Sequence, residues 1–99
     1  MRKLTWSVEK NRELKSAKAR NVCFEDIAAA IDSGGLLDEI AHPNADKYPH
    51  QRILVVRVHG YLYGVPCVTT VDGLFLKTAY PSRRLKKLYQ SGKTNDQNS

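Results

Sequence analysis

The sequence predicts an α+β domain in which two N-terminal helices pack on a four-stranded, mainly antiparallel sheet, and a short C-terminal helix follows. Good helix formers without Gly or Pro fill residues 8–20. β-Branched residues dominate residues 52–58. Two dipeptides that favour tight hairpins, His59-Gly60 and Asp72-Gly73, divide the second half of the chain into strand-length segments. Helices followed by a run of strands are typical of α+β domains.

The first helix is predicted over residues 8–20, with Ser7 as its N-cap. Its apolar stripe is thin, and cations cover most of its surface. The second helix is predicted over residues 25–32 and ends at Ser33-Gly34-Gly35. Its core-facing stripe has helical spacing and consists of Phe24, Ile27, Ala28 and Ile31. We expect Trp6 and Phe24 to be core aromatic residues.

The strands are predicted at residues 36–42, 52–58, 61–71 and 74–80, with a polar, proline-containing loop between the first two. Because strand side chains alternate, the two turns assign them to faces. An apolar face that packs on the helices should hold Leu54, Val56, Val58, Tyr61, Tyr63, Val65, Cys67 and Leu76. The opposite face should hold Ile53, Val55, Arg57, Leu62, Gly64, Pro66, Val68, Phe75 and Lys77. This second face mixes aliphatic side chains with two cations, which favours a binding surface, and a bulge is possible at Gly64.

Composition sets the broad class of the protein. Its 99 residues are 41% hydrophobic and 26% charged, which predicts one globular domain at residues 1–90 and a disordered polar tail at 91–99. No apolar run approaches the length of a membrane span, and the N-terminus has no secretion signal. Cys23 and Cys67 have no metal-binding or redox spacing, so we expect two free thiols in the cytoplasm.

The net charge of +6 is unevenly distributed. The first twenty residues carry seven Lys and Arg against two Glu, whereas residues 21–50 carry six acids against Lys47 alone. The stretch from Lys77 to Tyr89 is basic again, with five cations and no acid. Two basic ends brought together by folding would form a positive face, which suits a nucleic acid or an acidic protein.

Several short stretches resemble a known family. Trp6-Ser-Val-Glu-Lys-Asn11, then Arg20-Asn-Val-Cys-Phe-Glu-Asp26, is similar to the N-terminal half of the BrnT-like toxins. Lys77 and Pro81-Ser82-Arg83 are similar to the strand and helix start near the C-terminus of that family. These toxins are small ribonucleases of type II toxin–antitoxin modules, related in fold to RelE and ParE.

The resemblance implies a metal-independent endoribonuclease without a cofactor, which arrests translation and growth and is neutralised by a cognate antitoxin. It implies that Lys77 and Arg83 stabilise the charge on the phosphate, and that Tyr80 or Tyr89 donates a proton or stacks on a base. Further RNA contacts are then expected from Arg57, Lys15, Lys18, Arg20 and Arg84.

The chain departs from the family pattern at two positions. Arg20 stands where the family usually has a histidine, and Asn21 stands in place of the turn glycine. If that histidine acts chemically, its replacement affects activity, whereas arginine can bind phosphate in its place. The three histidines of this chain are His42, His50 and His59, and none lies in the basic segment or shows metal-ligand spacing.

Two other functions stay open. A binding module that does not cleave its nucleic-acid or protein ligand would use the same face and show salt-sensitive binding. A toxin of ParE type would act on a protein target and leave RNA intact.

Overall fold

The computed structural model describes residues 3–16, 22–85 and 87. In these residues the chain forms two helices and a sheet, in the order β1 (Lys3–Trp6), α1 (Val8–Ser16), α2 (Phe24–Asp32), β2 (Leu36–Ala41), β3 (Gln51–Val58), β4 (Tyr61–Thr69), β5 (Gly73–Leu76) and β6 (Tyr80–Pro81). Residues 83–85 and 87 are helical, as expected for a short C-terminal helix. The expected tail at 91–99 and the expected helical residues 17–20 lie outside the described residues. None of the described helices has the length and apolarity needed to cross a membrane.

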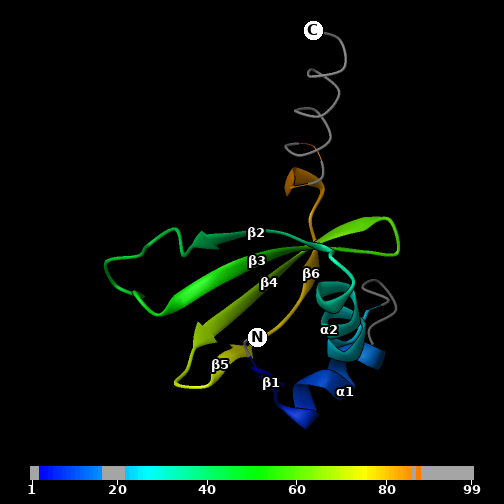
Figure 1. Ribbon diagram of the computed structural model, residues 1–99, viewed down its shortest axis with the longest axis horizontal. Coiled ribbons are helices and arrows are strands. Elements are labelled where there is room, and N and C mark those ends of the chain that lie inside the picture. Colours follow the sequence, from blue (N-terminus) through cyan, green and yellow to red (C-terminus); the bar gives the residue numbers. More distant parts are fainter. Residues whose placement is uncertain (1–2, 17–21, 86, 88–99) are drawn as a thin grey trace, which may run out of the picture.

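The sheet has six strands rather than the four predicted, in the order β1-β5-β4-β3-β2, and β6 also pairs with β4. Its pairs are antiparallel except for β1 and β5, which run parallel. Sequence patterns did not identify β1 because a short strand before a helix cap leaves no periodic signal. Figure 1 shows β1 lying beside β5, next to the two helices.

The hairpin of β3 and β4 was predicted correctly. Val58 pairs with Tyr61 across the turn, and the pairing continues without a break to Gln51 and Val68. His59 and Gly60 both have positive φ, 53° and 82°, as a two-residue turn of this hand requires. The possible bulge at Gly64 is therefore absent from this hairpin.

The second turn was predicted one residue too late. Thr69 pairs with Leu74 and Cys67 pairs with Leu76, so the two turn residues are Val71 and Asp72. Thr70 closes this turn, because its N–H donates to the carbonyl of Gly73 and its hydroxyl accepts from the N–H of Gly73. A turn at Asp72-Gly73 would have paired Leu76 with Thr69, two residues from its observed partner Cys67, so Leu76 stays on the predicted face of the sheet.

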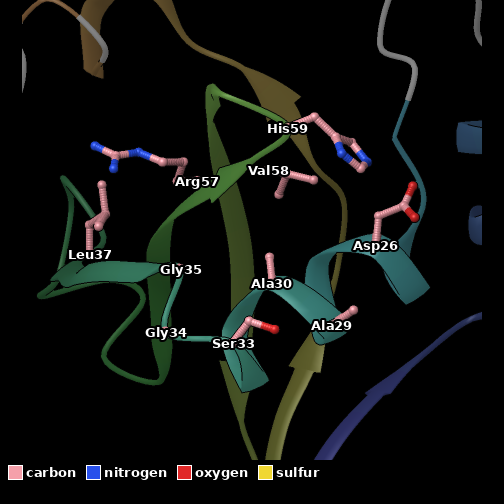
Figure 2. Close-up of a pocket in the computed structure, with 10 residues that line it drawn as sticks. All are labelled: Asp26, Ala29, Ala30, Ser33, Gly34, Gly35, Leu37, Arg57, Val58 and His59. Atoms are coloured by element: carbon pink, nitrogen blue, oxygen red, sulfur yellow. The ribbon is translucent and has the colours of Figure 1, made fainter.

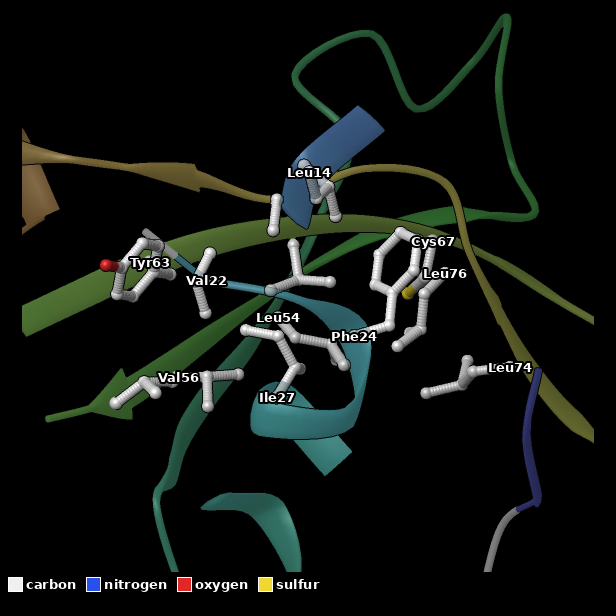
Figure 3. Close-up of a cluster of buried hydrophobic side chains, with 13 residues drawn as sticks. Leu14, Val22, Phe24, Ile27, Leu54, Val56, Tyr63, Cys67, Leu74 and Leu76 are labelled. Atoms are coloured by element: carbon white, nitrogen blue, oxygen red, sulfur yellow. The ribbon is translucent and has the colours of Figure 1, made fainter. Parts of the chain in front are cut away.

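The core lies between the helices and the predicted apolar face of the sheet. Leu14 of α1 and Phe24 and Ile27 of α2 pack with sheet residues from β3, β4 and β5 (Figure 3). The buried hydrophobic cluster comprises Leu14, Val22, Phe24, Ile27, Leu54, Val56, Val58, Tyr63, Val65, Cys67, Leu74, Leu76 and Ala79. Trp6 stacks on Phe24 with ring centroids 5.5 Å apart, which confirms both as core aromatic residues. Cys23 and Cys67 are free thiols, as expected.

Tyr61 departs from the prediction, and a second apolar residue, Val8, is also exposed. Tyr61 is 58% exposed because it flanks the hairpin turn, beyond the reach of the helices. Val8 is 69% exposed at the start of α1. The stripe of α1 is completed instead by a polar residue, Asn11, which is only 5% exposed.

Asn11 joins α1 to the N-terminus of α2. Its side-chain oxygen accepts a hydrogen bond from the N–H of Phe24 at 2.8 Å, and its side-chain nitrogen donates to Glu25 at 2.7 Å. The first N–H groups of a helix have no partner within the helix, so Asn11 satisfies one of them from outside. Asp26 accepts the N–H of Cys23 in the manner of a capping box.

We expect the substitution Asn11→Ala to lower the free energy of unfolding by about 1–3 kcal/mol, because the buried N–H of Phe24 loses its acceptor. Urea unfolding measures this change, and Arg12→Ala, at the exposed next position of α1, is the control. Equal losses in the two variants would contradict the role of Asn11.

The same contact predicts a dependence of stability on pH. The hydrogen bond from Asn11, aided by Cys23 and Lys15, lowers the pKa of Glu25 from 4.5 to about 2. Because the pKa is lower in the folded state, the carboxylate stabilises the fold fully above pH 4.5, and this stabilisation disappears as the pH falls towards 2. The side chain is 54% exposed, so solvent screening reduces the size of the effect. In urea unfolding from neutral to acidic pH, the stability difference between the wild type and Glu25→Gln should shrink. A difference that is independent of pH would show that the carboxylate charge is not involved.

Candidate nucleic-acid interface

The face of the sheet that points away from the helices carries three of the residues predicted to act, Arg57, Lys77 and Tyr80. We call it the open face, and its members are Lys3, Thr5, Asp38, Ile40, Gln51, Ile53, Val55, Arg57, Leu62, Gly64, Pro66, Val68, Phe75, Lys77 and Tyr80, as the strand registers and the hydrogen bond from Lys77 to Pro66 assign them. Arg57 and Lys77 share this face, as the sequence predicted. Its charged side chains are three cations and one carboxylate.

Tyr80 reaches the open face through an irregularity between β5 and β6. Leu76 pairs with Cys67, and Tyr80 pairs with Gly64. Four steps from Leu76 to Tyr80 therefore match three steps along β4, which leaves one extra residue, as in a β-bulge. With strict alternation Tyr80 would have pointed into the core. The extra residue leaves Ala79 buried in the core and puts Tyr80 on the side of Lys77.

The ring of Tyr80 lies on Gly64. A methyl group placed on Gly64 would be 2.6–2.8 Å from the ring atoms Cζ and Cε2 and the hydroxyl oxygen of Tyr80. Only glycine leaves room for the ring at this distance from the sheet. Val55, which pairs with Gly64, is fully buried in this part of the open face.

Arg57, Arg83 and Arg84 lie at or beyond one end of this surface. The N–H of Ser82 donates to the carbonyl of Leu62, and Leu62 pairs with Arg57. Ser82 therefore lies in the same row of the sheet as Arg57, with β4 between them. Ser82 then caps the C-terminal helical turn by accepting the N–H of Leu85 at 3.1 Å. Arg83 and Arg84 follow it and are exposed. Lys77 is separated from the row of Arg57 by four residues of β4, about 13 Å, so the two cations reach a common phosphate only through extended side chains.

Some predicted residues are not brought to the open face. Lys15 lies on α1 in the helix layer, where its ammonium group is 3.6 Å from the carboxylate of Glu25. The expected positions Lys18, Arg20 and Tyr89 lie outside the described residues. The histidines lie elsewhere too: His42 accepts the N–H of Asn44 in the loop before β3, and His59 forms the hairpin turn.

A cavity of about 470 Å³ lies between α2 and the hairpin of β3 and β4. Figure 2 shows the side chains of Asp26 and His59 at one end of it, with that of Arg57 extending in the opposite direction, towards Leu37. Small residues from the end of α2 form its floor. Sequence reasoning did not identify it, because Asp26 and His59 are joined only by the packing of the helix against the hairpin.

The thiol and phenol near this cavity are poor nucleophiles. Burial raises the pKa of Cys23, whose thiol donates to Asp26 at 3.3 Å. Burial, and then the nearby Tyr61 and Asp26, raise the pKa of Tyr63. Both groups therefore stay protonated near neutral pH. Within the described part of the chain no cluster of three or more His, Cys, Asp or Glu could hold a metal ion.

Comparison with known proteins finds no family model, no curated protein and no solved structure that matches this chain. The site must therefore be judged on its own geometry.

The contact between Tyr80 and Gly64 can be tested by Gly64→Ala. The added methyl group meets the far end of the Tyr80 side chain, so we expect the ring to move and the strand pairing to remain. Nuclear Overhauser effects between the Tyr80 ring and residue 64 should disappear, while those between β3 and β4 persist. Loss of the cross-strand effects as well would mean that the glycine is needed for the sheet itself.

Proposed function

We propose that this chain is the toxin of a type II toxin–antitoxin module, a metal-independent endoribonuclease that acts in the cytoplasm. The observation that carries the proposal is the one-residue bulge before β6, because it brings Tyr80 to the same open face as Lys77. A phenol and an ammonium group on one accessible surface, with Arg83 just beyond it, are groups that phosphodiester cleavage can use.

The architecture agrees with this proposal. Two helices on one face of a mainly antiparallel sheet, with a short C-terminal helix, is the arrangement that a relationship to RelE and ParE implies. The motif residues Lys77, Ser82 and Arg83 lie close together in the sequence, at the end of the sheet and the start of the helical turn. The two free thiols suit a reducing compartment.

Each group has a role in the proposed reaction. The 2′-hydroxyl oxygen attacks the phosphorus and loses its proton to water, while the bond to the 5′-oxygen breaks. The 5′-oxygen takes the proton of the Tyr80 hydroxyl, which is then replaced from water. Lys77 and Arg83 stabilise the negative charge that builds up on the phosphate oxygens. Arg57 and Arg84 bind neighbouring phosphates.

The proposed antitoxin neutralises this site by covering it. The open face has exposed cations at Lys3, Arg57 and Lys77, so an acidic segment would complement it. The complex would be a hetero-oligomer of toxin and antitoxin.

One observation favours binding without cleavage as a second candidate. None of the described members of the open face is a histidine, so the usual acid–base group is missing from that surface. Under this alternative the protein binds RNA through the same residues and leaves it intact.

We expect purified wild type to cleave RNA in the presence of a chelator, and Lys77→Ala or Arg83→Ala to reduce the rate by about 10²- to 10³-fold, because each removes charge stabilisation from the transition state. Tyr80→Phe keeps the ring and should reduce the rate by about 10²- to 10⁴-fold if the hydroxyl donates the proton. The rate is measured on a labelled RNA, and growth arrest on expression is followed in parallel.

Lys47→Ala is the matched control, because it removes one exposed cation from the loop before β3 and should leave the rate unchanged. RNA that stays intact with wild-type protein, although it binds, would reject the nuclease in favour of the binding module. Intact RNA together with a DNA-damage response would point to a protein target.

A further inference from the structure

Aromatic rings occupy two positions on the open face. The other described aromatic side chains lie in the core, in the loop before β3 or beside the hairpin turn, which leaves Phe75 and Tyr80 on this surface. Both are half-buried. An aromatic ring held against a sheet with its outer side accessible is a surface on which a nucleic-acid base can stack.

Tyr80 is fixed in the orientation that stacking needs. Its ring lies on the backbone of Gly64, where a side chain as small as a methyl group would collide with it. One side of the ring is therefore covered by the sheet, and the ring has little freedom to turn. A ring fixed in this way loses little conformational entropy when a base is placed on it.

Phe75, Lys77 and Tyr80 form a column along the segment from β5 to β6. Phe75 pairs with Val68, the N–H of Lys77 donates to the carbonyl of Pro66, and Tyr80 pairs with Gly64. Their partners are two residues apart on β4, so neighbouring members of the column are about 7 Å apart. A cation thus stands between two rings, as a base–phosphate–base sequence requires.

The charge of this surface favours a polyanion over an apolar partner. Lys3 on β1 pairs with Gly73, two residues before Phe75, and Arg57 lies across the sheet, whereas Asp38 on β2 is the one acid among the described members of the face. Bases within a duplex have their faces covered by their neighbours, so stacking on these rings requires an unpaired strand.

We propose that the open face binds single-stranded RNA, with bases stacked on Phe75 and Tyr80 and the intervening phosphate paired with Lys77. This inference rests on the proposed function and specifies its substrate: unpaired rather than double-stranded RNA. Phe75 is then the residue that holds the base on the side of Lys77 away from Tyr80.

The test is equilibrium binding of a short labelled 2′-O-methyl oligoadenylate, either alone or annealed to its complement. The 2′-O-methyl group removes the nucleophile, so binding is measured without cleavage. We expect the single strand to bind at least about tenfold more tightly than the duplex, since stacking on one exposed ring already supplies that much. Phe75→Leu and Tyr80→Leu should each weaken binding roughly five- to a hundredfold, and Tyr80→Phe should leave it nearly unchanged.

Two controls separate stacking from charge. Tyr61→Leu removes a ring that is 58% exposed outside the open face and should not affect binding. Lys77→Ala should lower the slope of log affinity against log salt by about 0.7, the value for one phosphate of a single strand, whereas Phe75→Leu should leave the slope unchanged.

Equal affinity for strand and duplex, or losses at Phe75 and Tyr80 no larger than at Tyr61, would overturn the proposal. Absence of any oligonucleotide binding would also overturn it and would leave the face to a protein partner. Absence of cleavage is a separate result. If the wild type does not cleave RNA but the substitutions at Phe75 and Tyr80 weaken binding, the data support this inference alone. Cleavage that is insensitive to Phe75→Leu supports the nuclease alone.

Discussion

The rest of the structure depends on the pairing of β3 with β4. The left-handed conformation of His59 and Gly60 fixes the turn, and eight residue pairs follow from it without interruption. Once this register is set, alternation determines which side chains face the helices and which face away. Phe24 and Ile27 pack on one face of the hairpin, and β5 and β6 pair with the side of β4 that faces away from β3.

The parts that sequence patterns predicted are those governed by local periodicity. The hairpin, its two faces and the stripe of α2 follow from repeats of two or of about four residues, and the packing of Leu54 and Val65 in the core agrees with them. The parts that were missed depend on contacts between distant residues. The burial of Asn11 becomes intelligible only when the N-terminus of α2 lies beside it, because a polar residue within a helix otherwise indicates a solvated surface.

The candidate site illustrates the same division. Arg57 and Lys77 were assigned to one face by parity, and their registers agree. Tyr80 was grouped with them because it is near Lys77 in the sequence, although simple alternation gives the two opposite faces. The residues 74–80 read as one continuous strand, so nothing in them signalled the break between β5 and β6 that makes the grouping possible. The roles of Lys15 and Arg83 depend on the ligand and cannot be read from the pattern of the chain.

The parallel pairing of β1 with β5 has a consequence for how the chain reaches its fold. Thr5 pairs with Phe75, so this edge of the sheet closes a loop of about 70 residues. Pairing of β1 with β5 forms only after the intervening hairpins have brought the two strands closer together. Without those hairpins, the contacts between β1 and β5 would not offset the entropy lost on closing the loop. A nascent chain emerging from the ribosome therefore holds β1 unpaired until β5 has been made. The column of Phe75, Lys77 and Tyr80 follows β4 and completes the surface at the same late stage, so partly synthesised chains lack the proposed site.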